Sequence, residues 1–251
     1  MKGSRDGSGG GGAIREWVHR QDFDPSWAGI FVNPFAVARR GLSKVMRRLG
    51  PAVQGRTLDV GCGRKPYQAF LRSTEYVGLE VDSATARAAS LADVYYDGRA
   101  FPFEAQSFDS VVATQVLEHV PSPDEFLSEI HRVLRDRGVL LLTVPFVWDE
   151  HEQPRDFTRF TSFGVRRCLE DAGFDVQEAA KSVADVRVFF QLANGYVYKK
   201  TRCCRGWINR LSTLALMAPL ALAGEALALL LPGSEDLYLD NVVLARKRRH
   251  T

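Results

Sequence analysis

Short apolar runs alternate with longer amphipathic segments through the middle of the chain. The apolar runs indicate β-strands over residues 57–60, 76–80, 94–97, 110–114 and 139–144. Before the last of these, apolar residues recur at helical spacing, at Phe126, Leu127, Ile130, Val133 and Leu134. Strands that alternate with helices in this order favour a parallel sheet with right-handed crossover connections.

The helix that begins after Ser122 has the clearest start signals. Ser122 can cap it, Pro123 suits the first helical position, and Glu125 completes a capping box. We expect Gly138 to end this helix. A further helix is predicted over 161–172, with Gly173 as its end. Strands at 174–180 and 237–245 follow, and these two can form an antiparallel hairpin on an otherwise parallel sheet.

Composition and charge narrow the class of protein. The chain has 251 residues, of which 45% are hydrophobic and 25% charged, as in ordinary globular domains. Its net charge of +3 gives no global basic field, so we expect no nucleic-acid partner. The four cysteines form no Cys-x-x-Cys pair, and no apolar signal segment opens the chain. We therefore expect a reducing, cytoplasmic location.

Composition also suggests how the chain divides into segments. Residues 1–12 are rich in glycine and serine, so we expect a disordered tail. Aromatic and basic residues alternate over 13–50, which predicts an N-terminal helical cap. The cofactor-binding core is expected over 51–182, a helical and partly apolar insertion over 183–235, and the last strand with a basic tail over 236–251.

The first strand runs into an acidic residue and a glycine turn, Leu58-Asp59-Val60-Gly61-Cys62-Gly63. Glycines allow a sharp turn and let a ligand approach the backbone, and an acid at a strand's carboxyl end can accept hydrogen bonds from it. A dinucleotide-binding fingerprint would place a third glycine at the position of Pro66, which we expect to begin a short helix instead. The chain has no Gly-Lys-Ser/Thr, which excludes a P-loop.

Five segments in register resemble the class I S-adenosylmethionine (SAM)-dependent methyltransferases that act on small molecules, quinones and glycans. They are the glycine turn, Gly78-Leu79-Glu80, the stretch from Phe101-Pro102-Phe103 to Val111, Leu117-Glu118-His119-Val120, and Phe126 to Leu140. The resemblance implies an α/β fold of the Rossmann-like class I methyltransferase type. Its sheet is mostly parallel with an antiparallel last strand, N-terminal helices precede it, and a helical insertion stands before the last strand. SAM is the implied cofactor.

The resemblance also implies roles for residues of the cofactor site. Asp59 would lie near the amino acid moiety of SAM, and Gly61 and Gly63 would let the cofactor approach, with Cys62 as a small filler. Glu80 would accept both ribose hydroxyls, in preference to its competitor Asp82. Asp97 would hold the adenine amino group. Gln115 and Val116 would flank the cofactor. The pair Glu118 and His119 commonly serves the structure of this loop in similar proteins.

The acceptor region is expected just beyond the fifth strand, over residues 145–160, where open α/β sheets place substrates. His151 is the candidate catalytic base if the acceptor is a hydroxyl. Arg155 and Arg159 could bind an anionic acceptor group, and Trp148 could contact the substrate. A role in pinning the loop remains an alternative for this segment. Three acids beside one histidine are typical of a solvated face, so we expect no metal site.

Residues 211–231 are largely apolar and follow a group of basic residues, Lys199, Lys200, Arg202, Arg205 and Arg210. Pro219 and Glu225 should divide the stretch into halves too short to span a bilayer. A strand after the insertion that rejoins the sheet also argues against spanning. Three alternatives remain: a helical pair that covers the domain, a homodimer face, or peripheral contact with the inner face of a membrane.

The sequence thus predicts a SAM-dependent methyltransferase that transfers a methyl group to a hydroxyl or similar nucleophile. The expected acceptor is a small molecule, a glycan or a lipid-linked compound. One alternative is a non-catalytic SAM-binding or membrane-recruitment module. An NAD-dependent dehydrogenase is disfavoured by Pro66.

Overall fold

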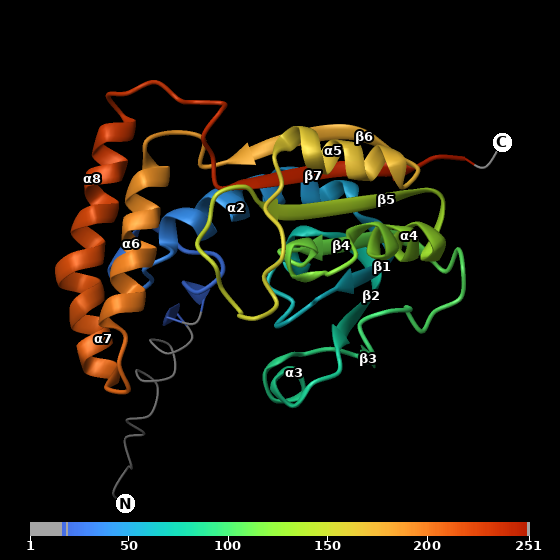
Figure 1. Ribbon diagram of the computed structural model, residues 1–251, viewed down its shortest axis with the longest axis horizontal. Helices are drawn as coiled ribbons and strands as arrows, with labels where there is room; N and C mark the ends of the chain where they lie inside the picture. Colours follow the sequence, from blue (N-terminus) through green and yellow to red (C-terminus); the bar gives the residue numbers. More distant parts are fainter. Residues whose placement is uncertain (1–16, 19, 250–251) are drawn as a thin grey trace, which may run out of the picture. The chain divides into compact units, whose positions relative to one another are not determined.

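The computed structural model describes residues 17, 18 and 20–249, and its chain divides into two units (Figure 1). The sheet unit comprises residues 44–184 and 235–251, and the helical unit comprises residues 1–43 and 185–234. The expected disordered tail at 1–12 lies outside the described residues. Each unit is a separate cluster of contacts, and each is described by itself below.

The sheet unit contains one seven-stranded sheet in the order β3-β2-β1-β4-β5-β7-β6. The strands are β1 (Gln54–Val60), β2 (Arg72–Val81), β3 (Val94–Tyr96), β4 (Phe108–Thr114), β5 (Leu134–Pro145), β6 (Phe174–Ser182) and β7 (Asp240–Lys247). β1 to β5 pair in parallel, and β7 is antiparallel to both of its neighbours. This confirms the predicted fold class.

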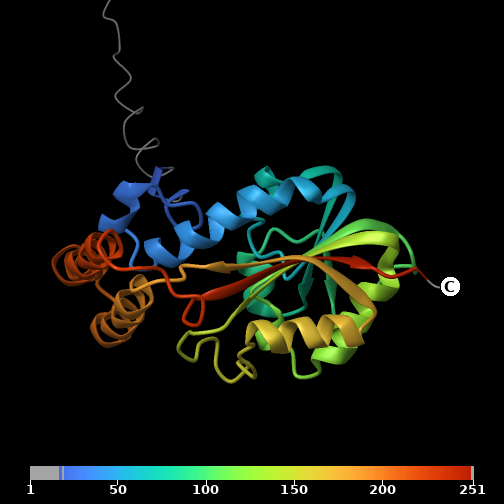
Figure 2. The same cartoon turned by 90° about the horizontal axis from the view of Figure 1, so that it is seen from above.

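The helices of the sheet unit are α3 (Ala84–Ala89), α4 (Pro123–Val133) and α5 (Ser162–Asp171), and α2 (Ala36–Leu49) enters it at Lys44. Figure 2 shows α4 and α5 on the same face of the sheet. Their apolar sides, including Leu127 of α4 and Val165 of α5, join the core. The central strands are buried in this core through residues such as Leu58 and Leu140. Strands buried on both faces explain the continuous apolar runs in the sequence.

The strand order places several chain turns at one edge. β2 and β3 lie on one side of β1, whereas β4 and β5 lie on the other, so the order reverses between β1 and β4. Because β1 to β5 are parallel, the turns that follow them all lie at the carboxyl edge. A crevice for ligands is expected at such a reversal.

The α4 region differs from the prediction. The helix begins at Pro123, but the Ser122 side chain makes no capping hydrogen bond, and the helix ends at Val133 because Leu134 already belongs to β5. Gly138 therefore lies inside a strand. A Cβ there would stand 2.8 Å from the Arg135 carbonyl oxygen, so close packing and not a helix end requires glycine. Likewise, Pro66 begins no α-helix, since only a 3₁₀ turn, Gln68–Phe70, follows it.

The helix α5 follows its predicted signals closely. The hydroxyl of Thr161 accepts a hydrogen bond from the Gly164 backbone N–H at 3.0 Å, which satisfies one of the free donors of the first turn. After the helix, Gly173 adopts a φ of +87°, a conformation that glycine tolerates best.

The helical unit contains the 3₁₀ turn Trp27–Phe31, α6 (Arg187–Thr201), α7 (Gly206–Ser212), a π-helical turn (Thr213–Met217) and α8 (Ala218–Ala228). α7, the π-helical turn and α8 form one continuous helix of 23 residues, Gly206–Ala228, and an 18-residue window of this helix has a mean hydropathy of 1.6. By length and composition this helix could cross a membrane. The predicted division at Pro219 and Glu225 was therefore wrong.

Two local features explain why the long helix is not broken. Pro219 lies in the first turn of α8, directly after the π-helical turn, where the regular hydrogen-bond ladder is already shifted. Glu225 is mostly buried and pairs with Arg40 and, at 3.3 Å, with Arg187. Both arginines belong to the same unit, so the charge of Glu225 is matched inside the helical unit.

Replacement of Thr161 by alanine tests the capping of α5. We expect Thr161→Ala to lower the free energy of unfolding by about 1 kcal/mol, because one first-turn donor loses its partner. Ser122→Ala is the matched control, since Ser122 makes no such bond, and it should change stability by less than about 0.5 kcal/mol. Urea unfolding of both variants measures the difference. Equal losses in the two variants would contradict the assignment.

Candidate functional site

The glycine turn after β1 is fixed by close packing. Gly61 and Gly63 have φ values of +68° and +47°. A Cβ on Gly61 would stand 2.4 Å from Cγ2 of Val116, whereas a Cβ on Gly63 would meet no atom within 4 Å. The first glycine thus brings the turn against the segment after β4. The second leaves open space beside the backbone, as the approach of a ligand requires.

Cys62 lies between these glycines and is buried. A Cβ on Gly78 of β2 would stand 2.8 Å from its Sγ, so the thiol fills the space that Gly78 leaves. Burial and the nearby carboxylates of Asp59 and Glu80 raise the pKa of the Cys62 thiol to about 12. The thiol is therefore protonated at neutral pH, which suits a packing role and not that of a nucleophile.

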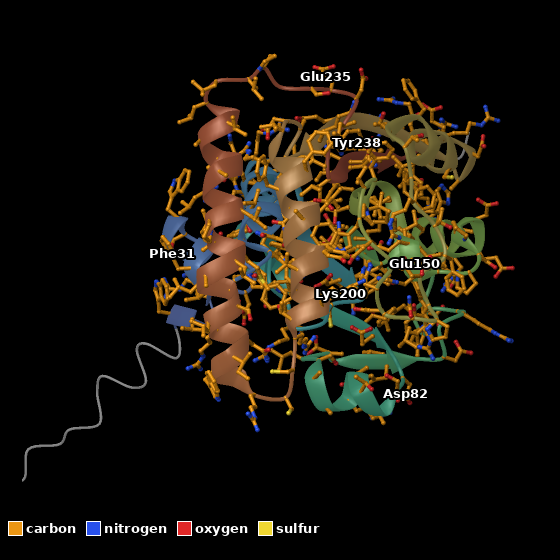
Figure 3. All side chains as sticks on the ribbon, turned by 60° about the vertical axis from the view of Figure 1, so that its left-hand side comes forward. Phe31, Asp82, Glu150, Lys200, Glu235 and Tyr238 are labelled. Atoms are coloured by element: carbon orange, nitrogen blue, oxygen red, sulfur yellow. The ribbon has the colours of Figure 1, made fainter. Side chains whose placement is uncertain are left out.

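Glu80, near the end of β2, faces the glycine turn. Its carboxylate accepts hydrogen bonds from the backbone N–H of Gly63 at 3.0 Å and of Val81 at 3.2 Å. Its sequence competitor Asp82 instead accepts two hydrogen bonds from Arg87 at 2.7 and 2.8 Å. Figure 3 shows Asp82 at the outer end of this segment, beside α3. The structure thus places Glu80, and not Asp82, against the glycine turn.

Asp59 is a buried carboxyl group near the end of β1. It accepts a hydrogen bond from the Tyr76 hydroxyl. Its burial, opposed in part by that hydrogen bond, raises its pKa to about 7. The ammonium of Lys65, which partly opposes this rise, is itself paired with Asp93 at 2.6 Å. A cationic ligand group at the carboxyl edge would therefore stabilise the ionised form of Asp59.

The other cofactor residues expected from the sequence lie at the same edge. Asp97 directly follows β3, is exposed, and accepts a hydrogen bond from the Arg99 backbone N–H at 2.9 Å. Gln115 follows β4 with a φ of +56°. Its side-chain amide donates to the hydroxyl of Thr143 at 3.1 Å, so this side chain is held against β5. Val116 packs on Gly61, as described above.

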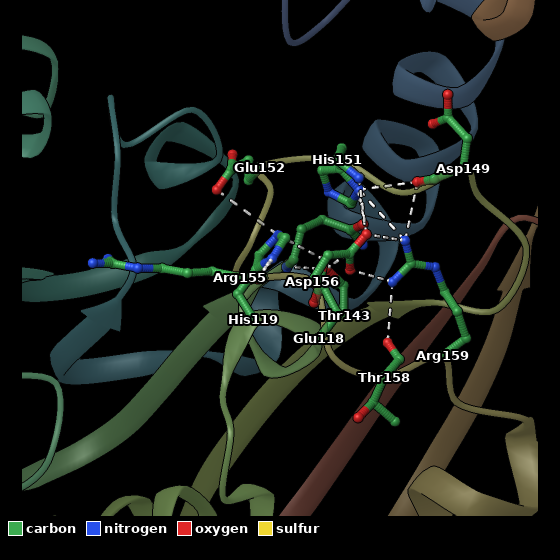
Figure 4. A network of polar contacts seen from close by, with 11 residues as sticks. Glu118, His119, Thr143, Asp149, His151, Glu152, Arg155, Asp156, Thr158 and Arg159 are labelled. Carbon is green, nitrogen blue, oxygen red and sulfur yellow. Dashed lines mark hydrogen bonds and ion pairs between the residues drawn. The ribbon is translucent and has the colours of Figure 1, made fainter.

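The loop after β5 forms a second polar cluster (Figure 4). Arg159 donates to both carboxylate oxygens of Asp156, at 2.5 and 2.6 Å, and to the Asp149 carbonyl at 3.0 Å. This pairing holds the pKa of Asp156 well below its usual range. Asp156 in turn accepts from the His151 backbone N–H at 2.9 Å. Arg159 is therefore engaged in holding the loop.

The remaining acceptor residues from the sequence occupy the same loop. The Arg155 side chain is exposed, which leaves it better placed than Arg159 for an anionic group in solution. Trp148 is half-buried. The His151 ring stands edge-to-face with the His119 ring, with 4.8 Å between centroids.

Glu118 is the feature that sequence reasoning undervalued. Its backbone carbonyl accepts hydrogen bonds from Phe157 and Thr158, at 2.9 and 3.3 Å, which is a structural role for this segment. Its side chain, however, is 0% exposed, and neither carboxylate oxygen has a hydrogen-bond partner among the described residues. Burial raises its pKa to about 8. The signal in the sequence was the adjacency of Glu118 and His119 directly beyond a buried strand.

Three of these side chains could hold a metal ion. Glu118, His119 and His151 offer ligand atoms that all lie within 4.8 Å of one another. The residues that could bind a nucleoside-like cofactor are separate from these and surround the glycine turn. The carboxyl edge thus carries a cofactor-type site and a polar cluster.

Comparison with known proteins matches part of the chain to a known family. Residues 58–142 match a family described as a methyltransferase domain. A sterol 24-C-methyltransferase of Clavispora lusitaniae is 28% identical over 179 residues, which cover 58% of this chain and 48% of that protein. A probable SAM-dependent methyltransferase of Mycolicibacterium smegmatis is 32% identical over 149 residues, covering 53% and 58%. The chain spans about half the length of the curated relatives it matches.

Solved structures share the fold at low sequence identity. The [4+2]-cyclase SpnF has a TM-score of 0.53 and 22% identity, covering 83% of this chain and 81% of that one. Phosphoethanolamine N-methyltransferase 2 of Haemonchus contortus, in complex with SAM, has a TM-score of 0.51 and 19% identity, covering 89% and 56%. These similarities show a class I methyltransferase fold, and SAM is named in the relative from Mycolicibacterium smegmatis and in the Haemonchus complex.

The raised pKa of Asp59 predicts that the stability of the folded protein depends on pH. Its folded pKa of about 7 exceeds its ordinary value of 3.8, so the folded chain binds the extra proton and stability falls as pH rises from about 4 to 7. We expect Asp59→Asn to raise the melting temperature at pH 8 by about 2 °C or more, with a smaller gain at pH 5. Calorimetry without ligand at both pH values measures this. A gain that is the same at both pH values would contradict the assignment.

Proposed function

We propose that this protein, which belongs to the SAM-dependent methyltransferases, transfers the methyl group of SAM to a hydroxyl or similar nucleophile of a small-molecule, glycan or lipid-linked acceptor. One observation carries the proposal. The open backbone at Gly63, the buried Asp59 and the Glu80 carboxylate stand at one sheet edge, next to a polar cluster at the end of β4 and β5.

The residues around the glycine turn fit the cofactor. Asp59 would accept from its ammonium group, which supplies the positive charge that this buried carboxylate lacks. Glu80 would exchange its bond to the Gly63 N–H for the ribose hydroxyls, and Asp97, exposed after β3, would accept from the adenine amino group. Gly61, Cys62 and Val116 would form the packed floor of the site, with Gln115 beside them.

Methyl transfer requires mainly that the protein align the acceptor with the methyl group of SAM. Bound SAM supplies a methyl group that is already electrophilic. Holding an acceptor in line with it can contribute several kcal/mol, up to roughly 7–11 in well-aligned systems. Hydrogen bonds between Asp156 and Arg159 cross-link the loop of residues 145–160, so it can present His151, Arg155 and Trp148 to an acceptor. Where the acceptor is a hydroxyl, the two histidines are the groups that could help remove its proton.

Two alternatives remain testable. A SAM-binding module without transferase activity would bind the cofactor and methylate nothing, and the [4+2]-cyclase neighbour shows that this fold is not limited to one reaction. An NAD-dependent dehydrogenase would need close helix packing beside a pyrophosphate, but Pro66 stands at the required glycine position. A titration with NADH should therefore show no binding.

The helical unit supports a lipid-linked acceptor. All but three of the exposed large apolar side chains in the described part of the chain belong to this unit, the exceptions being Leu91, Phe157 and Phe163. Basic residues gather where α6 leads into α7, namely Lys199, Lys200, Arg202, Arg205 and Arg210. An apolar surface with cations beside it suits an anionic bilayer. The name of the Clavispora relative also refers to a lipid, a sterol.

The connections of the unit favour contact with one face of the bilayer over a span. β6 and β7, which flank the insertion, pair with each other at Ser182 and Asp240, so the chain leaves and re-enters at the same place. The 15 residues of α6 extend about 22 Å, less than a bilayer core of about 30 Å. We therefore propose that the helices lie in the interface and bring the enzyme to the inner face of a membrane.

Calorimetric titration with S-adenosylhomocysteine tests the cofactor site. We expect wild-type protein to bind, Asp59→Ala to bind undetectably, and Glu80→Ala to bind about 10- to 100-fold more weakly, because charge-assisted hydrogen bonds are lost. Asp82→Ala is the matched control and should bind as wild type, since Asp82 pairs with Arg87 at the surface. Absence of binding by folded wild-type protein would refute the proposed function.

Vesicle flotation tests the membrane contact. We expect wild-type protein to float with phosphatidylglycerol-containing vesicles and much less with phosphatidylcholine alone. Leu229→Asp with Leu230→Asp, at side chains 87% and 79% exposed, should weaken this by about 100-fold or more, because two leucines no longer enter the bilayer. Leu91→Asp, an exposed leucine of the sheet unit, should float as wild type. Protein that stays unbound with both vesicles, or a stable homodimer that buries these leucines, would contradict membrane contact.

A further inference from the structure

The Glu118 carboxylate is in an environment that neither of its protonation states suits. Ionised, it would be a buried charge without a hydrogen-bonded counterion, because the nearby Arg159 guanidinium is bound to Asp156, and such burial costs several kcal/mol. Protonated, its O–H would be a buried donor without an acceptor, because neither oxygen has a hydrogen-bond partner among the described residues. A cation bound directly to the carboxylate removes both penalties.

His119 is oriented to bind such a cation. Its Nδ1 lies 2.6 Å from the Arg155 carbonyl oxygen. A carbonyl can only accept, so Nδ1 carries a proton, and in the neutral imidazole Nε2 keeps its lone pair. That Nε2 lies 3.8 Å from Oε1 of Glu118. A backbone carbonyl that fixes the tautomer of a histidine in this way is a common second partner of metal-binding imidazoles.

His151 has a similar arrangement on the opposite loop. Its Nδ1 lies 3.2 Å from the Asp149 carbonyl oxygen and 3.4 Å from Oδ2 of Asp156. These two nearer partners are acceptors, so in the neutral ring they favour a proton on Nδ1 and the lone pair on Nε2. The Arg159 guanidinium, 3.5 Å from the same Nδ1, is neutralised by its two bonds to Asp156. The positive charge of Arg159 is thus matched locally.

From these contacts we propose that Glu118, His119 and His151 bind a divalent transition-metal ion through one carboxylate oxygen and two imidazole nitrogens. This donor set suits zinc and its first-row neighbours. Ligand atoms around a tetrahedral zinc ion stand about 3.4 Å apart, so the observed 3.8 Å between Glu118 and His119 closes with a small side-chain movement. The exposed carboxylate of Glu152, 3.9 Å from His119 Nε2, can approach from the solvent side.

The proposal departs from the expectation of no metal site. In the sequence, the acids beside His151 suggested a solvated face, and the structure agrees that Glu150 and Glu152 are exposed. The decisive ligand comes instead from the turn after β4, where Glu118 is fully buried. A buried carboxylate without a hydrogen-bond partner among the described residues, next to two oriented histidines, is a different environment from a solvated acidic loop.

The position of the ion suggests its use, and this step rests on the proposed function. The cluster lies beyond β4 and β5, where the acceptor is expected. An acceptor hydroxyl bound to the metal would lose its proton to solvent more readily, since coordination lowers the pKa of bound oxygen acids. The ion would also orient that oxygen. His151 would then act as a metal ligand and not as the general base.

Metal titration of chelator-treated, full-length protein tests the site. We expect one equivalent of Zn²⁺ by calorimetry, and visible d–d absorption when one equivalent of Co²⁺ is added. Glu118→Gln and His151→Ala should each weaken Zn²⁺ binding by about 100-fold or more. Glu150→Gln, which removes an exposed charge from the same loop, should bind as wild type. Melting temperatures of all variants check that they are folded.

The outcomes separate this inference from the proposed function. No saturable one-to-one binding, or equal binding by wild type, Glu118→Gln and His151→Ala, overturns the metal site. Binding that follows the expected pattern supports it even if S-adenosylhomocysteine does not bind, in which case only the proposed function fails. Where a methyl acceptor is found, transfer that persists unchanged after chelation overturns the activating role and leaves the site itself standing.

Discussion

The contact between Gly61 and Val116 holds the two halves of the site together. A Cβ at position 61 would stand only 2.4 Å from Cγ2 of Val116, so Val116 fills the space that a side chain there would need. Val116 also begins the turn that carries Glu118 and His119, since its carbonyl accepts from the His119 N–H at 2.9 Å. The Glu118 carbonyl in turn holds the loop at Phe157 and Thr158. One chain of contacts therefore fixes the glycine turn, the buried acid and the acceptor loop relative to one another.

Two buried acids with raised pKa values lie at this edge, and burial is the main cause for each. Asp59, with a pKa of about 7, is partly compensated by the Tyr76 hydroxyl, whereas Glu118, with a pKa of about 8, has no side-chain partner among the described residues. Such positions destabilise the protein without ligand. Both would be eased by positive charge, from the ammonium of the proposed cofactor at Asp59 and from the proposed metal ion at Glu118. The cost in stability would then have a functional explanation.

Local signals in the sequence predicted the elements that depend on them. The alternation of strands and helices, the glycine turn and the ends of α5 at Thr161 and Gly173 all follow from nearby residues. Gly138 misled because β5 begins at Leu134 and ends α4 before that glycine, and Ser122 precedes α4 without making the capping hydrogen bond. Pro219 misled because a π-helical turn lets the long helix continue. Glu118 could not be assigned, because its burial depends on how the loop after β5 folds over the turn after β4.

Incubation with methyl-labelled SAM and fractionated lipid, glycan and small-molecule extracts tests the central claim most directly. The account predicts that label enters a product in one fraction, in step with the release of S-adenosylhomocysteine, and that Glu80→Ala reduces this while Asp82→Ala does not. Cofactor binding by folded protein with no labelled product in any fraction would contradict it.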